Sequence, residues 1–127
     1  MTAQLNHTIV FSKDNKAGAT FLAEMLGLPA PVPFGPFMVV EAGNGVSLDY
    51  MTTTDDVAYA HYAFLISEEE FDQVFARIQE KNLDYWGDPH GQHRGEINHD
   101  DGGRGVYFHS PDGHHLEVIT RPYGSGS

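Results

Sequence analysis

The chain has 127 residues, 40% of them hydrophobic, and carries 18 acidic residues against 7 basic ones, for a formal net charge of -11. This length suits a single domain with its own core, and because cysteine is absent, disulfides and zinc–thiolate sites are excluded. The shortage of lysine and arginine argues against a nucleic-acid partner, and without a signal-peptide pattern or a run of roughly 18 apolar residues we expect a cytoplasmic protein with no membrane partner.

The first half of the chain predicts a strand, a helix and two further strands. Residues 5–12 are rich in Ile, Val, Thr and Phe, which is typical of a strand. Apolar residues at helical spacing predict a helix from about 14 to 26, which the following glycine ends. Four prolines between 29 and 36 exclude a helix and predict an extended loop. Two strands are then expected at 36–42 and 45–51, joined by a Gly-Asn-Gly turn.

The second half repeats this order. Residues 60–67 predict a strand, and Ser67 with Glu70 has the spacing of a capping box at the start of a helix. The remaining expected elements are a short strand at 85–86, a long polar loop at 87–103, and strands at 104–110 and 114–120.

The repeated order predicts one α+β domain built from two modules of about 55 residues each. Module one covers about 5–52 and module two about 60–120, with a linker at about 53–59 and a flexible tail at 121–127.

Three polar side chains occupy matching places in the two modules. Strand alternation puts His7 on the face of Ile9, which should be buried, and puts Glu117 between two aliphatic neighbours in the last strand. His61 stands in the first strand of module two, as His7 does in module one. Two imidazoles and a carboxylate are the ligands of a facial triad, which holds a divalent metal and leaves positions open. Asp49, the module-one counterpart of Glu117, is a candidate fourth ligand.

Each of these residues also has an ordinary structural interpretation. A single strand histidine is more often a core or edge residue than a ligand. Glu117 has Arg104 and Arg121 as candidate ion-pair partners, and Asp49 is a candidate solvent-facing residue. The coincidence of position, not any one residue, favours the metal site.

The segments LNHTIV, HYAFLI and YFHSPDGHHLEVI resemble the vicinal oxygen chelate superfamily, which includes glyoxalase I, fosfomycin-resistance enzymes, extradiol dioxygenases and bleomycin-resistance proteins. The resemblance extends from residue 5 to about 120. It implies paired βαβββ modules whose curved mixed sheets form a central cleft around a metal, and a homodimer in which the ligands come from one chain or from two. The family's ligand positions match His7, His61 and Glu117, and Asp49 stands near the fourth ligand of glyoxalase I.

The resemblance leaves the reaction open. Seven basic residues are a thin supply for the carboxylates of a glutathione adduct, and Ile9 with an acidic loop departs from the fosfomycin enzymes. The extradiol pattern fits better, with His99 as a proton-transfer group and Tyr107 as a hydrogen-bond donor. A solvated loop histidine and a core aromatic are the alternative interpretations of these two residues.

We therefore expect a divalent-metal enzyme, using Fe, Mn, Ni or Zn, that acts on a small oxygen-rich substrate by dioxygenase or by isomerase or lyase chemistry. Arg104 and Arg121 are the candidates for binding an anionic group, and Trp86 is a candidate for the substrate wall. The alternative is a protein that sequesters an antibiotic without catalysis.

Overall fold

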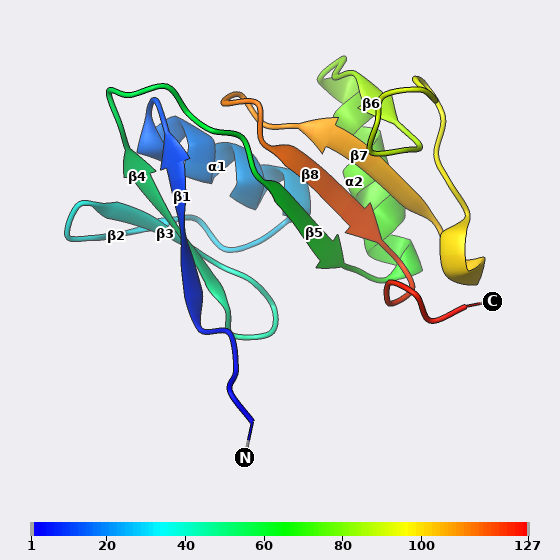
Figure 1. The fold of residues 1–127 in the computed structure, drawn as a ribbon, viewed down its shortest axis with the longest axis horizontal. Helices are drawn as coiled ribbons and strands as arrows, with labels where there is room; N and C mark the ends of the chain where they lie inside the picture. The colour runs from blue at the N-terminus through cyan, green and yellow to red at the C-terminus, as the bar shows by residue number, and fades with distance from the viewer. Residues whose placement is uncertain (1, 127) are drawn as a thin grey trace. The chain divides into compact units, whose positions relative to one another are not determined.

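Two modules with the same element order make up the chain (Figure 1). The computed structural model describes residues 2–126. It divides into a unit that ends at Ala58 and a unit that begins at Tyr59, a boundary inside the predicted linker. The α+β class and the paired βαβββ modules are confirmed.

The first unit contains one four-stranded sheet and one helix. Its elements are β1 (His7–Ser12), α1 (Asn15–Leu26), β2 (Val32–Phe34), β3 (Phe37–Glu41) and β4 (Ser47–Thr52). The strands lie in the order β1-β4-β3-β2, with β1 parallel to β4 and the other two pairs antiparallel.

One strand lies where the prolines predicted an extended loop. Pro33 of β2 stands opposite Met38 of β3 in an antiparallel pair. Proline has no N–H to donate to a ladder, but β2 is the edge strand of its sheet, where a missing donor is tolerated. The loop prediction was therefore wrong for this segment, because prolines exclude a helix without excluding an edge strand.

The second unit repeats the architecture. Its elements are β5 (His61–Leu65), α2 (Glu68–Glu80), β6 (Tyr85–Trp86), a 3-10 turn η1 (Asp100–Gly102), β7 (Gly105–His109) and β8 (His115–Ile119). The strand order is β5-β8-β7-β6, again with the first strand parallel to the last and the other pairs antiparallel.

Side-chain caps begin both helices. The Asp14 carboxylate accepts hydrogen bonds from the backbone N–H groups of Lys16 and Ala17, at 3.1 and 3.2 Å. At α2, the Ser67 hydroxyl accepts from the Glu70 N–H at 3.0 Å, and the Glu70 carboxylate accepts from the Ser67 N–H at 2.9 Å. The capping box expected from the sequence is thus confirmed.

Two glycines let α1 end and lie close to its sheet. Gly27 closes the helix in the left-handed conformation, with φ of 67°, which a side chain would disfavour. A Cβ atom on Gly18 would stand 2.8 Å from the Ser12 hydroxyl and 3.1 Å from the Tyr50 ring. A larger residue at position 18 would therefore push the helix away from β1 and β4.

In each unit the helix lies against one face of its own sheet (Figure 1). In the first unit Val10 and Tyr50 are buried, whereas Ile9 and Phe11, on the opposite face of β1, are 43% and 48% exposed. The prediction that His7 shares a buried face was therefore wrong, because one helix can cover only one face of a sheet.

The C-terminal tail is tied to the 3-10 turn. The backbone N–H groups of Gly124 and Gly126 donate to the two carboxylate oxygens of Asp101, at 3.0 and 2.9 Å. The segment that the sequence predicts to be flexible therefore has hydrogen-bonded contacts up to residue 126.

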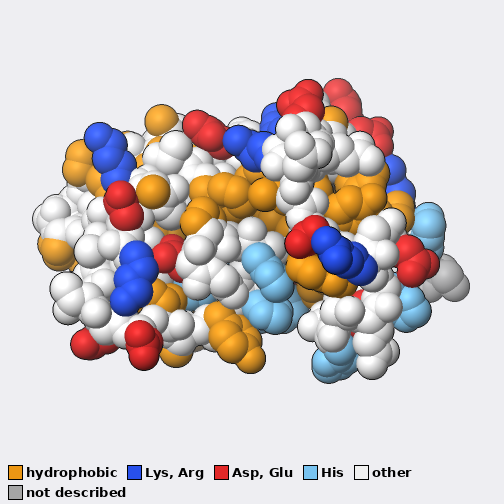
Figure 2. Space-filling view, turned by 90° about the horizontal axis from the view of Figure 1, so that it is seen from above, with side chains coloured by type: hydrophobic (Ala, Val, Ile, Leu, Met, Phe, Trp, Pro, Cys, Tyr) orange, Lys and Arg blue, Asp and Glu red, His pale blue; other side chains and the backbone are white. Residues whose placement is uncertain are grey.

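Charges of both signs are interspersed over the surface. Figure 2 shows red and blue side chains scattered among uncharged ones, with no continuous basic patch on the face it presents of the described residues. Within residues 2–126, none of the helices has the length and apolar character needed to cross a bilayer.

We predict that Ser67→Ala destabilises the protein by about 1 kcal/mol, because it removes the hydroxyl that caps the first turn of α2. Chemical denaturation measures the change, with Ser125→Ala in the exposed tail as the matched control. Equal stability of the two variants would contradict the role given to the cap.

Candidate functional site

The strand pairings make Asp49 and Glu117 equivalent residues. In the first unit His7 stands opposite Ser47, and Asp49 follows two residues later. In the second unit His61 stands opposite His115, and Glu117 follows two residues later. Residues two apart on a strand point to the same face of the sheet. Each module therefore has a histidine on its first strand and a carboxylate on its last strand, on the same face.

His61 and Glu117 form a close pair in the second unit. The His61 Nε2 atom lies 2.9 Å from Glu117 Oε1, and the two side chains are 48% and 8% exposed. Glu117 lies between Leu116 and Val118, which are buried on the other face of β8. A buried carboxylate is stable only with partners, and an imidazole nitrogen beside a carboxylate oxygen is a donor set that a divalent metal accepts. These two residues fit the predicted metal.

Tyr107 completes the surroundings of Glu117. It stands opposite Glu117 in the β7–β8 ladder, and its ring centroid lies 5.8 Å from that of His61. Burial, followed by the hydrogen bond to the Glu117 carboxylate, raises the pKa of Tyr107 well above its ordinary value of 10.0. The phenol therefore keeps its proton near neutral pH and donates to the carboxylate. The predicted role of Tyr107 as a hydrogen-bond donor to a bound substrate or to oxygen stays a prediction.

A row of neighbouring rings crosses the same face of this sheet. Trp86 and His109 meet at a tilt with centroids 4.7 Å apart, His109 and His115 do the same at 4.5 Å, and His115 stacks on Tyr59 at 4.8 Å. Burial, followed by the charge of His109, lowers the pKa of His115. The prediction that Trp86 belongs to the wall of a substrate site stays a prediction. His109 was missed, although it stands two residues after Tyr107 and so shares its face.

His114 has a structural role. It is 2% exposed, and its Nδ1 atom accepts the backbone N–H of Ala60 at 3.0 Å. Its ring meets Tyr62 edge-on, with centroids 5.9 Å apart. This histidine fixes the entry of the chain into β5, immediately before His61.

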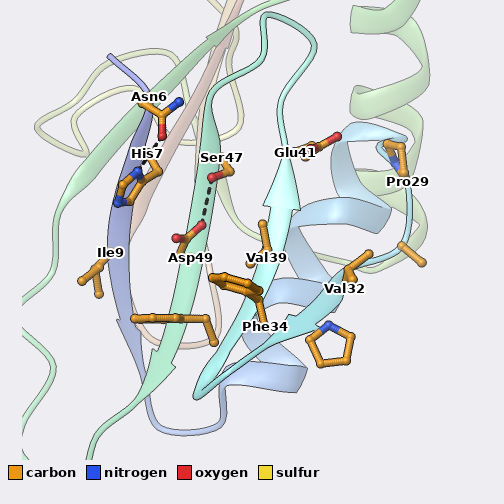
Figure 3. Close-up of a pocket in the computed structure, with 13 residues that line it drawn as sticks. Asn6, His7, Ile9, Pro29, Val32, Phe34, Val39, Glu41, Ser47 and Asp49 are labelled. Atoms are coloured by element: carbon orange, nitrogen blue, oxygen red, sulfur yellow. Dashed lines mark hydrogen bonds between the residues drawn. The ribbon is translucent and has the colours of Figure 1, made fainter. Parts of the chain in front are cut away.

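In the first unit His7 and Asp49 line a pocket of about 620 Å³ (Figure 3). Asp49 is 9% exposed and accepts a hydrogen bond from the Ser47 hydroxyl at 2.9 Å. His7 Nδ1 lies 2.7 Å from the Asn6 side-chain oxygen. The alternative interpretation of Asp49 as a solvent-facing residue is wrong, because Asp49 lies in the middle of a central strand.

Among residues 2–126, no group of three or more histidine and acidic side chains is gathered closely enough to hold a metal ion. The second unit supplies the pair His61 and Glu117, and the first unit supplies His7 and Asp49 in a separate pocket. The assignment of all four to one metal stays a prediction.

Three other candidates have different surroundings. The Arg104 guanidinium bonds to Glu68 at 2.7 Å and Asp72 at 2.9 Å, and lies 4.4 Å above the Phe71 ring centroid. It therefore pairs with α2 and not with Glu117. Arg121 is exposed just after β8. His99 is exposed before η1. The structure does not bring Arg104 to the Glu117 face.

The chain has close relatives, although no protein-family model matches it. The glutathione transferase FosA of Serratia marcescens is 30% identical over 124 residues, which cover 93% of this chain and 81% of that protein. The solved structure of the oxidase ChaP-H1 is 58% identical, with a TM-score of 0.95, and the match covers 97% of this chain and 99% of that chain. A solved glyoxalase/dioxygenase from Nostoc punctiforme, 24% identical with a TM-score of 0.66 over 94% of this chain and 91% of that one, shows the shared fold alone.

We predict that Tyr107→Phe leaves the tyrosinate absorbance that develops up to about pH 10.5 equal to that of the wild type, because the buried phenol does not ionise in this range. The raised pKa means that the folded protein favours the neutral Tyr107 phenol over the ionised one. The contribution of this preference to the free energy of unfolding is complete below pH 10.0, and it is lost as the pH rises through the higher pKa that Tyr107 has in the folded protein.

The matched control is Tyr123→Phe, which removes a side chain that is 89% exposed. A loss of tyrosinate absorbance in Tyr107→Phe as large as that in Tyr123→Phe would contradict the burial and hydrogen bonding of the Tyr107 phenol.

Proposed function

This chain belongs to the vicinal oxygen chelate superfamily, and from that membership we propose that it is a divalent-metal-dependent enzyme that oxidises a small oxygen-rich organic substrate. The observation that carries the proposal is the 2.9 Å pair of His61 Nε2 and the buried Glu117 carboxylate. Glu117 stands on a central strand with this half-exposed imidazole beside it, and the two side chains together offer a nitrogen and an oxygen that a divalent metal binds.

The proposed ligands are His7, His61 and Glu117, with Asp49 as a candidate fourth. The identical register of the two modules supports this set, because it gives each module one histidine and one carboxylate on the same sheet face. Two imidazoles and a carboxylate suit Fe(II), Mn(II), Ni(II) or Zn(II). Such a metal supplies Lewis-acid catalysis to neighbouring substrate oxygens and, if it is iron, redox chemistry.

The residues around the pair have defined tasks in this proposal. Tyr107 keeps its proton and donates it in a hydrogen bond to Glu117, which holds the carboxylate in one orientation. The row of rings from Trp86 to Tyr59 forms an aromatic border on the same face. His99 is the proposed acid–base group, although its exposed position requires substrate or loop movement to bring it into use.

Two observations favour oxidation over group transfer to glutathione. The relative with 58% identity is named an oxidase. The basic side chains that would bind glutathione carboxylates are largely engaged, since Arg94 pairs with Asp84 at 2.6 Å and Arg104 pairs with two acids of α2. Isomerase or lyase chemistry at the same metal is the neighbouring alternative.

A homodimer is part of the proposal. Leu5 and Leu65 are 70% and 60% exposed, and large apolar side chains of this kind are commonly covered at subunit interfaces.

Protein purified without chelator or oxygen should contain about one divalent metal per chain. His61→Ala and Glu117→Ala should each lose nearly all of it, because each removes a ligand. The matched controls are His90→Ala and Glu96→Ala, which alter exposed side chains of the loop after β6. Elemental analysis measures the content, and full metal content in both ligand variants would overturn the site.

Metal-loaded protein should consume oxygen with a panel of catechols and other vicinal oxygen compounds. The rate should fall at least about 100-fold in His61→Ala. Loss of a residue that only orients a metal ligand already lowers activity by about 10- to 100-fold, and loss of the ligand itself should lower it further. An oxygen electrode follows the reaction. Substrate conversion without oxygen uptake would replace oxidation by isomerase or lyase chemistry. If the protein binds an organic compound tightly but holds no metal and does not convert the compound, the result would favour the alternative of an antibiotic-sequestering protein.

A further inference from the structure

The buried histidine His114 lies at the end of the turn that joins β7 to β8, and this turn holds its backbone in place. The His114 N–H donates to the Ser110 hydroxyl at 3.1 Å, and the Ser110 N–H donates to the His114 carbonyl at 3.0 Å. Gly113 stands between them with a φ of 88°, a conformation that a side chain would disfavour. These contacts fix the backbone of His114 within its own hairpin.

Both backbone polar groups of Ala60 bond to this segment. The Ala60 N–H donates to the ring nitrogen Nδ1 of His114 at 3.0 Å, and the Ala60 carbonyl accepts the His115 N–H at 2.8 Å. The first bond requires a neutral His114 ring with its proton on Nε2, because a protonated Nδ1 has no lone pair to accept with. Ala60 directly precedes His61 in the chain. The two hydrogen bonds therefore set the direction in which the chain enters β5 at His61.

The His114 ring also contacts the residue that follows His61. It meets the Tyr62 ring edge-on, with centroids 5.9 Å apart, and Tyr62 stands opposite the buried Leu116 of β8. Successive residues of a strand point to opposite faces of the sheet. Holding Tyr62 on the face of Leu116 thus leaves His61 on the other face, where its Nε2 atom lies 2.9 Å from Glu117 Oε1.

The first module shows the same strand pairing without such a histidine. Val46 occupies the position of His114, immediately before the last strand of the module, and its side chain offers no hydrogen-bond acceptor. In this module His7 Nδ1 lies 2.7 Å from the side-chain oxygen of Asn6, and Asp49 accepts a hydrogen bond from a serine hydroxyl. Among the described residues, the imidazole lies on the strand carboxylate in the module that has the buried histidine.

We propose that His114 is a positioning residue whose ring, through Ala60, sets the His61 imidazole against the carboxylate of β8. The inference rests on the proposed function only in its consequence for the metal, which a displaced His61 would bind less tightly. Groups that orient a metal ligand typically change the affinity for the metal by about 10- to 100-fold. His114 acts through the backbone, so the expected loss is at the lower end, about tenfold.

Three substitutions of His114 in the full-length chain separate its acceptor from its bulk. His114→Asn keeps an acceptor oxygen at about the distance of Nδ1 from the backbone, whereas His114→Gln carries the same amide one carbon further out. His114→Leu fills the buried site without any acceptor and leaves the Ala60 N–H without its partner. The matched control is Val74→Ala in α2, a residue that is 1% exposed, because it lowers stability without touching Ala60.

The first measurement is made by NMR on metal-free protein. In the wild type, the Ala60 amide should exchange slowly with solvent, and a cross-peak should connect the rings of His61 and Tyr107, whose centroids are 5.8 Å apart. His114→Gln and His114→Leu should speed the exchange at Ala60 at least about tenfold and weaken the cross-peak. His114→Asn should preserve both signals, and Val74→Ala should preserve the cross-peak.

The second measurement is the affinity for Zn(II), obtained by competition with a chelator. His114→Gln and His114→Leu should bind zinc about tenfold more weakly than the wild type, and His114→Asn should restore most of the affinity. Val74→Ala should bind zinc as the wild type does. Should His114→Leu fail to fold, the comparison of the asparagine and glutamine variants decides, because both carry the same polar group.

Two outcomes would overturn the inference. One is an unchanged contact between His61 and Tyr107 in His114→Gln and His114→Leu, and the other is an equal loss of that contact in Val74→Ala, which would reduce the role of His114 to general stability. If the wild type binds no zinc but the NMR signals follow the expected pattern, the proposed function fails and the positioning role stands. Stoichiometric zinc that all His114 variants hold with unchanged affinity and ring contact would do the reverse.

Discussion

Parallel pairing of the first and last strands, in the same register in both modules, is the constraint on which the site depends. In the second unit this pairing sets His61 opposite His115 and brings its ring to the carboxylate of Glu117, two residues further along β8. A slip of one residue would turn Glu117 into the aliphatic layer, where an ionised carboxylate is costly. Burial of Leu116 and Val118 under α2 therefore also positions the polar pair on the opposite face.

The two modules carry different side chains on the same framework. Each has one helix, so each leaves one sheet face for side chains that do not belong to the core. In the second unit this face carries an imidazole, a carboxylate, a protonated phenol and a row of neighbouring rings. In the first unit, Ser47 replaces the second histidine and a shorter carboxylate stands in an apolar pocket.

The acidic side chains of α2 form local ion pairs with Arg104, although the chain as a whole carries a net negative charge. Arg104 lies over Phe71 and between two acids of α2, so it stabilises the helix that covers the sheet. The Arg104 guanidinium is therefore occupied by two carboxylates of α2 and is not available to bind an anionic substrate.

Sequence patterns alone determined the order of helices and strands apart from β2, the cap at Ser67 and the face on which Glu117 lies, because helical and strand periodicity and caps are properties of neighbouring residues. Matching positions in the two modules predicted the His7, His61 and Glu117 set, and the family resemblance implies the same three residues. Only the tertiary structure decided that the edge strand tolerates Pro33, that α1 covers the face opposite His7, and that Arg104 pairs with α2. Those outcomes depend on contacts between residues far apart in the chain, and local patterns carry no information about which distant partner a side chain meets.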